Sequence, residues 1–201
     1  MGNRPAQGFR KDINPQTPVQ CGLSPWEIHY AGQVSQGPYT VLSSATPSFL
    51  HAYPFVLGQM INVNLLEFEV TTVGAAGSVA RVGLYASGPK PSHYPTTLIA
   101  DGGEYACDAV AGIKATTVNL CLSPGNYWFA YICGVAAPEI RVNPLANLSP
   151  LLGVPGSMGA NCNMVLRGAR TYGALPTTFP SGIIASVTTN NRILAHLKAA
   201  S

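Results

Sequence analysis

Acidic side chains are the first candidates for chemistry, because two carboxylates facing each other across a groove can act as acid, base or nucleophile. Glu67 and Glu69 stand two residues apart in an alternating stretch. On a strand, this spacing makes them neighbours on the solvent face rather than a catalytic pair. The other acids that could serve lie mostly at expected turns: Asp101, Glu104, Asp108 and Glu139. With only eight acidic residues in the chain, we predict that the protein is not an enzyme.

Histidine and cysteine, the residues that bind transition metals best, are scattered along the chain. None of the four histidines lies two or four residues from another histidine or a cysteine, and the five cysteines form no CxxC pair. Cys121 and Cys133 lie in apolar stretches, where a thiol packs as a small hydrophobic group. We predict no metal, no cofactor and free buried thiols, with a disulfide framework as the alternative.

Aromatic side chains offer a binding function instead, because an exposed ring can stack on a sugar and nearby polar groups can hold its hydroxyls. Tyr94, Tyr105 and Tyr172 lie in surroundings typical of loops, so we predict them as contacts to a glycan or another partner. Tyr127 and Trp128 belong to a strand that is apolar throughout, and we expect them in the core.

The elements that must position these residues are strands. Leu66, Phe68 and Val70 alternate with polar residues, and the pattern recurs with Gly or Pro breaks at intervals of about 8–12 residues. This spacing predicts an all-β fold, an antiparallel β-sandwich that is jelly-roll-like. Residues 134–190 are rich in Gly, Pro, Asn and Ser and predict long loops with one strand candidate at 161–167. Residues 191–198 predict a final strand, with a short helix as the alternative.

The first 24 residues form a separate segment. They lack periodicity, and three prolines among them favour an extended backbone. We predict an N-terminal anchoring arm over residues 1–24 and a β-sandwich domain over 25–201. The side chains expected to anchor the arm to a partner are Arg4, Phe9, Arg10 and Lys11. No apolar run suits a signal peptide or a membrane span, so we expect neither export by that route nor membrane insertion.

The composition bears on partners. Apolar residues make up 47% of the chain and charged residues only 9%, against about 25% in an ordinary soluble domain. Such a surface favours burial in a homo-oligomer or larger assembly, although a compact β protein with a Thr, Ser, Asn and Gly surface is the alternative. The net charge of +3 is too small, and its arginines too dispersed, for a nucleic-acid site.

Six motifs recur along the chain at the ends of the expected strands: Ala52-Tyr-Pro-Phe-Val56, Val70-Thr-Thr72 followed by Gly74-Ala-Ala-Gly77, Ala80-Arg-Val-Gly-Leu-Tyr85, Tyr94-Pro-Thr-Thr-Leu-Ile-Ala-Asp-Gly-Gly103, Leu122-Ser-Pro-Gly-Asn-Tyr-Trp128 and Ala174-Leu-Pro-Thr-Thr-Phe-Pro180. Together these motifs resemble a domain that recurs in bacteriophage tail-fibre and other virion surface proteins. The match is strongest over residues 48–144 and weaker towards the C-terminus.

The resemblance implies a small β-sandwich that serves as a structural or adhesive module. We therefore expect a non-enzymatic bacteriophage virion protein, assembled in the host cytoplasm and displayed on the particle surface. It would act either as a tail-fibre or receptor-binding module that contacts host glycan, or as a capsid-decorating or connector protein. Residues 1–24 would bind other capsid or tail proteins. The alternative is a carbohydrate-binding module of a cellular or polysaccharide-degrading protein.

Overall fold

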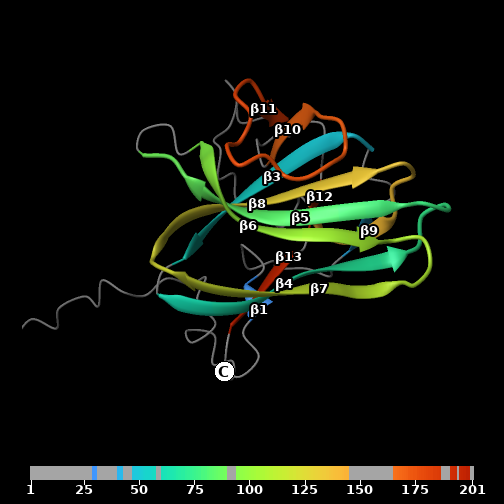
Figure 1. Cartoon of the computed structure of the whole chain (residues 1–201), viewed down its shortest axis with the longest axis horizontal. Helices are drawn as coiled ribbons and strands as arrows, with labels where there is room; N and C mark the ends of the chain where they lie inside the picture. Colours follow the sequence, from blue (N-terminus) through green and yellow to red (C-terminus); the bar gives the residue numbers. More distant parts are fainter. Residues whose placement is uncertain are drawn as a thin grey trace, which may run out of the picture.

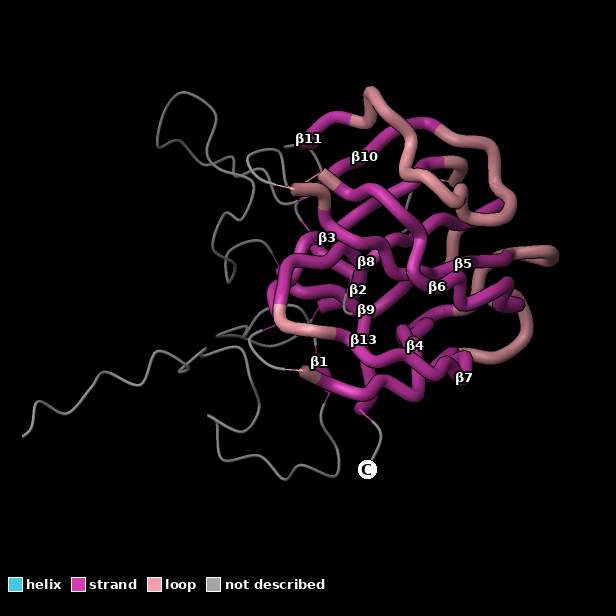
Figure 2. The backbone as a smooth tube through the Cα atoms, turned by 60° about the vertical axis from the view of Figure 1, so that its left-hand side comes forward, coloured by secondary structure: helices cyan, strands magenta, loops and turns pink. Residues whose placement is uncertain are grey.

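The chain is a β protein throughout the part that the structure describes. The computed structural model describes residues 29–30, 40–42, 47–57, 60–89, 94–144, 165–186, 191–193 and 195–199. These residues form thirteen strands and no helix (Figure 2). The expected arm at residues 1–24, with its four anchoring side chains, lies outside the described residues.

The strands form two antiparallel sheets that face each other (Figure 1). The central strands of the first sheet are β2 (Thr40–Leu42), β9 (Glu139–Pro144), β4 (Ile61–Thr72) and β7 (Gly112–Leu122), extended by β1 (His29–Tyr30), β12 (Asn191–Ile193) and β13 (Ala195–Ala199). The second sheet has the order β11 (Ile184–Ser186), β10 (Val165–Ala169), β3 (Phe49–Leu57), β8 (Gly125–Gly134), β5 (Val79–Ser87) and β6 (Pro95–Ala106).

The connections between these sheets follow jelly-roll topology. The strand orders β2-β9-β4-β7 and β3-β8-β5-β6 account for eight consecutive strands of the chain. From β2 to β9 each strand lies in the sheet opposite its predecessor, except for the β5–β6 hairpin, which stays within the second sheet. Eight strands paired in this way make the double Greek key of a jelly roll. The predicted jelly-roll-like sandwich is therefore confirmed, with β1, β10, β11, β12 and β13 as additions at its flanks.

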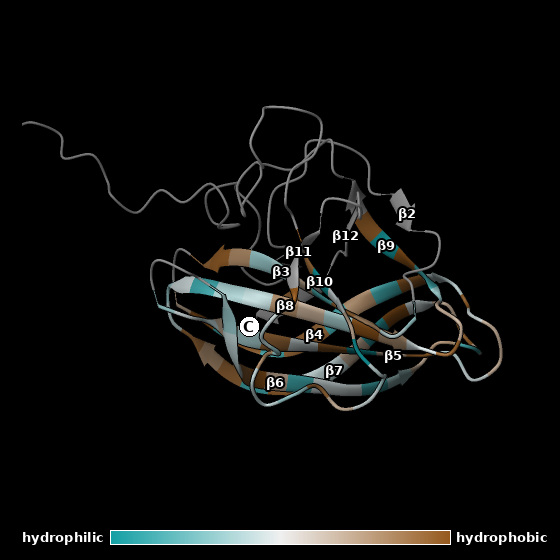
Figure 3. Ribbon diagram, turned by 90° about the horizontal axis from the view of Figure 1, so that it is seen from above, coloured by the Kyte–Doolittle hydropathy of each residue, from teal (hydrophilic) through white to brown (hydrophobic). Residues whose placement is uncertain are grey.

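The core between the sheets follows from the alternation of side chains along the strands (Figure 3). Leu66, Phe68 and Val70 of β4 are at most 2% exposed and face inward, as the sequence predicted. Phe68 meets the rings of Tyr105 and Tyr131 edge-on, at centroid distances of 5.2 and 5.9 Å. Such edge-to-face pairs stabilise a core beyond their buried area.

A third layer covers the outer face of the second sheet. We call residues 170–183 the strap, because this segment crosses that sheet and pairs with the free edge of β6. The Leu98 N–H donates to the Thr177 carbonyl at 2.9 Å, and the Phe179 N–H donates to the Thr96 carbonyl at 2.7 Å. Apolar side chains of the strap and the sheet form a second core beneath it: Leu50, Ala52, Tyr85, Trp128, Ala130, Ile132, Leu166, Leu175, Phe179 and Ile183. Strand β8 is thus covered on both faces, as its composition predicted.

Two expectations need correction. Residues 134–190 hold more strand than predicted, because β9 and β11 lie within them besides β10, which overlaps the strand candidate at 161–167. β9 and β11 are only six and three residues long, so their alternation is too short to detect. The expectation that Glu67 faces solvent is also wrong, since it is only 5% exposed on β4, which is flanked there by β7 and β13. At the C-terminus, β12 and β13 confirm the predicted strand, and the helix alternative is wrong.

Candidate functional site

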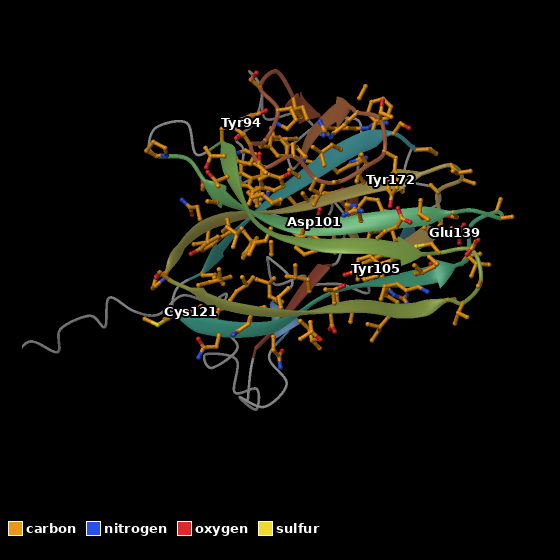
Figure 4. All side chains as sticks on the ribbon, viewed as in Figure 1. Tyr94, Asp101, Tyr105, Cys121, Glu139 and Tyr172 are labelled. Atoms are coloured by element: carbon orange, nitrogen blue, oxygen red, sulfur yellow. The ribbon has the colours of Figure 1, made fainter. Side chains whose placement is uncertain are left out.

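Tyr105, one of the three predicted contacts, lies in strand β6 and not in a loop. It is 8% exposed, and its ring packs against Phe68 between the sheets (Figure 4). The preceding Gly102 and Gly103 suggested a loop, but the β5–β6 pairing shifts register there, which marks a bulge within the strand. A ring buried in this way cannot stack on a sugar, so Tyr105 is no longer a candidate contact.

Tyr94 and Tyr172 are half-buried, and their hydroxyls bond within the chain. The Tyr94 hydroxyl lies 2.9 Å from the carbonyl oxygens of both Pro180 and Ile183 and shares its proton between them. The Tyr172 hydroxyl donates to Glu104 Oε2 at 3.0 Å. Burial and this carboxylate raise the pKa of Tyr172 to about 12. The two rings lie at opposite ends of the strap (Figure 4), so their present contacts hold the strap in place.

Asp101 of β6 joins the strap to the second sheet, between Tyr94 and Tyr172. Its carboxylate lies 2.9 Å from Arg81 Nη1, and it accepts hydrogen bonds from the N–H groups of Gly103, at 2.9 Å, and Leu175, at 3.2 Å. Gly83 completes the junction, because a Cβ there would overlap the Leu175 side chain. A carboxylate engaged with one cation and two backbone donors serves the fold.

Three further acids in the described ranges bind separate partners. Glu69 accepts two bonds from the Arg141 guanidinium, at 2.8 and 3.0 Å, and Glu139 accepts from the Thr72 hydroxyl at 2.6 Å. Asp108 accepts the Gly77 N–H at 2.8 Å. No group of three His, Cys, Asp or Glu side chains that could hold a metal occurs within the described ranges.

Cysteine and histidine occur in the core and at the surface. Among the described cysteines, Cys107 and Cys133 are buried and form no disulfide, and burial raises the pKa of each thiol to about 11. Cys121 is also free, but it is exposed on the outer side of β7, so the expectation of a buried thiol is wrong there. His51 is 2% exposed, and burial, aided by the nearby Arg167, lowers its pKa to about 4.

Sequence reasoning overlooked one surface, which we call the loop end: residues 73–78, 107–113 and 135–138. Hydrogen bonds tie these three segments together, from Gly74 N–H to the Cys107 carbonyl at 2.9 Å and from the Ser78 hydroxyl to the Ala136 carbonyl. They form one end of the sandwich, on the right in Figure 1. Four of the five large apolar side chains that are exposed in the described part lie here: Val73, Val110, Ile113 and Val135.

The loop end has a signature in the sequence. Three strand connections carry nearly the same small apolar composition: VGAAG at 73–77, AVAGI at 109–113 and GVAAP at 134–138. Turns are usually built from Gly, Pro, Asn, Asp and Ser, so alanine and valine in three of them is unusual. The recurrence of this composition indicates an apolar surface only when the fold is known to bring the three connections together.

Comparison of the chain with known protein families, with curated proteins and with solved structures gave no significant match. The resemblance to virion surface domains is therefore a prediction from the motifs. Within the described residues, no helix is long and apolar enough to cross a membrane.

Proposed function

We propose that the protein is a non-enzymatic structural protein of a bacteriophage virion, displayed on the particle surface as a homo-oligomer. One observation carries the proposal: four of the six motifs behind the resemblance, far apart in sequence, meet at the strap. Gly83, Asp101, Trp128 and Phe179 come from four different motifs and meet in this one structure. The jelly-roll order adds support, because this architecture is common in viral capsid and lectin domains.

Within that class, we propose a capsid-decorating or connector role ahead of receptor binding. Tyr105 is buried, and the hydroxyls of Tyr94 and Tyr172 are engaged within the chain. The exposed surface that stands out is the apolar loop end, which suits contact with protein better than contact with a hydroxyl-rich glycan. Residues 1–24 would attach the domain to other capsid or tail proteins through Arg4, Phe9, Arg10 and Lys11.

Imaging of intact particles with gold-labelled antibody tests this proposal. Label spread over the head is the expected result for a decorating protein. Label confined to the tail tip or fibres would reverse the preference in favour of host attachment. Particles without label would overturn the virion assignment and leave a cellular carbohydrate-binding module as the better hypothesis.

Deletion of residues 2–20 tests the arm separately. We expect the truncated domain to fold, because the described sandwich is built from later residues, and to be lost from particles. Normal incorporation of a folded truncated protein would contradict the anchoring role.

A further inference from the structure

His51 of β3 is enclosed between the two sheets without a hydrogen-bond partner. It is 2% exposed, and neither Nδ1 nor Nε2 is hydrogen-bonded within the described part of the chain. The ring stacks on Tyr53 and meets Tyr131 edge-on, at centroid distances of 6.3 and 6.5 Å. Most buried polar groups are paired, because an unpaired one costs free energy. These surroundings tolerate a neutral ring but do not stabilise a charged one.

The strand register sets a positive charge beside this ring. Arg167 of β10 and Tyr131 of β8 pair with His51 from its two sides. Directly paired residues of antiparallel strands point to the same face of a sheet, so both side chains lie next to the imidazole. The Arg167 guanidinium lies over the Phe49 ring, with Cζ 4.1 Å from the ring centroid.

No carboxylate of the described strands faces His51. The titratable groups that the strands around it turn towards the core are Tyr53, Tyr131, Cys133 and Arg167. Burial raises the pKa of Tyr131, and it raises that of Cys133 to about 11, so both are neutral in acid. The glutamates of β4 and β9 alternate with core residues and therefore point to the outer side of the first sheet. Protonation of His51 thus adds a second positive charge next to Arg167.

This arrangement couples acid to any opening of the fold around His51. Burial, aided by Arg167, lowers the pKa of His51 to about 4, whereas an exposed ring has a pKa of about 6.5. The closed state has its full stability above about pH 6.5 and loses stability as the pH falls towards 4. An opening that exposes the ring therefore becomes about twentyfold more favourable between pH 7 and pH 5.

Of the two ladders that flank His51, the one between β3 and β10 is the weaker. β8 pairs with β3 at seven positions and with β5 at eight. β10 pairs with β3 at only four positions, and its other neighbour, β11, is three residues long. Arg167 lies on β10 and is half-buried, so separation on this side moves the two like charges apart and returns them to water.

We propose that acid separates β10 from β3, while the jelly roll and the centre of the strap stay in place. The strap follows β10 in the chain, but its centre is bonded to Leu98 and Asp101 of β6, on the outer face of the second sheet. Once β10 leaves, the backbone groups of β3 become accessible, as at other free strand edges. The β3–β10 ladder is thus a pH-dependent switch at one edge of the sheet, and it is independent of the virion role.

Amide hydrogen exchange of the full-length protein, followed at pH 7 and pH 5 in low urea, tests the proposal. We expect the amides of β10 to exchange faster than those of β8 at both pH values. Their rates should depend little on urea, because a local opening exposes little surface. Their protection factors, which correct for the intrinsic effect of pH, should fall about twentyfold from pH 7 to pH 5.

Two results of this experiment would overturn the proposal. Equal protection and equal urea dependence in β10 and β8 would show that acid acts only through global unfolding. Protection of β10 that does not change with pH would show that its opening leaves His51 buried.

Three variants assign the effect to the two facing side chains. His51→Phe should abolish the acid-induced loss of protection in β10, since its ring fills the same space without titrating. Arg167→Met should weaken that loss by at least about twofold, and NMR should then show the His51 ring titrating at a higher pH than in wild type. Arg170→Met is the matched control, because this arginine lies just past β10 and acts on Tyr85, so both measurements should stay unchanged. An acid response that persists in His51→Phe, or that the two arginine variants alter equally, would contradict the proposal.

Discussion

The strap and the loop end use their residues in opposite ways. The strap carries aromatic side chains in a Gly- and Pro-rich segment, and its polar groups bond inward to Asp101, Tyr85 and β6. The loop end carries small apolar residues in three tight connections, and four large side chains point outward. The strap stabilises the second sheet, whereas the exposed apolar side chains of the loop end contribute little to the stability of the fold. Aromatic residues in loop-like sequence are thus poor guides to a binding surface in this chain.

The largest expected effect comes from emptying the core under the strap. Phe179 is 3% exposed and meets Tyr85 and Tyr94 edge-on, at 5.1 and 5.6 Å. Phe179→Ala should lower the free energy of unfolding by about 3–4 kcal/mol, through lost burial and a cavity. Urea denaturation measures the change, with Thr177→Ala as an exposed control on the same segment, expected within about 0.5 kcal/mol of wild type. A loss below about 1 kcal/mol for Phe179→Ala would mean that the strap is not part of the core.

A similar loss is expected from acid, which acts on the interior and not on the loop end. The pKa of His51 is about 4 in the fold and about 6.5 in the unfolded chain, because burial next to Arg167 favours the neutral ring. The resulting stability is fully present above pH 6.5 and declines as the pH falls towards 4, by about 3 kcal/mol in total. Denaturation of wild type and His51→Phe between pH 7 and 4 should show a shallower decline in the variant. Parallel curves would rule out His51 as the source.

Breaking the Asp101 junction should have a smaller effect. Asp101→Ala removes the Arg81 partner and the acceptor for the Leu175 and Gly103 N–H groups. We expect a loss of about 2 kcal/mol, moderated by the partial exposure of the pair, and faster amide exchange at Leu175. Asp101→Asn should lose less, because its carbonyl can still accept one N–H. Unchanged exchange at Leu175 in both variants would show that the strap is held without Asp101.

The sequence predicted the sheets better than it predicted their surfaces. Alternation of period two identified β4, β5 and β7, because one face of each of these strands packs in the core, and a continuous apolar run identified β8, which is covered on both faces. It could not reveal that residues 174–180 cross a sheet, since pairing between segments far apart in sequence depends on tertiary packing. Tyr105 was misplaced for a related reason, because a glycine pair marks a bulge as readily as a loop.

The surroundings of the tyrosines predicted as glycan contacts also depend on tertiary packing, which local sequence does not show. Nothing local distinguishes a tyrosine that stacks on a ligand from one that donates to a carbonyl on the far side of a loop, as Tyr94 does at residues 180 and 183. The loop end was equally hidden, since its three connections are separated in sequence by roughly 20 to 30 residues and become neighbours only through jelly-roll topology.

The central claim is that the loop end keeps apolar side chains for an outside contact at a cost to its own fold. The most direct test is the unfolding free energy of Val135→Asn against wild type. We predict that the variant is more stable by about 1 kcal/mol, because asparagine accepts a φ of 55° that valine resists. A variant that is less stable than wild type would show that Val135 serves the fold, and it would contradict the account.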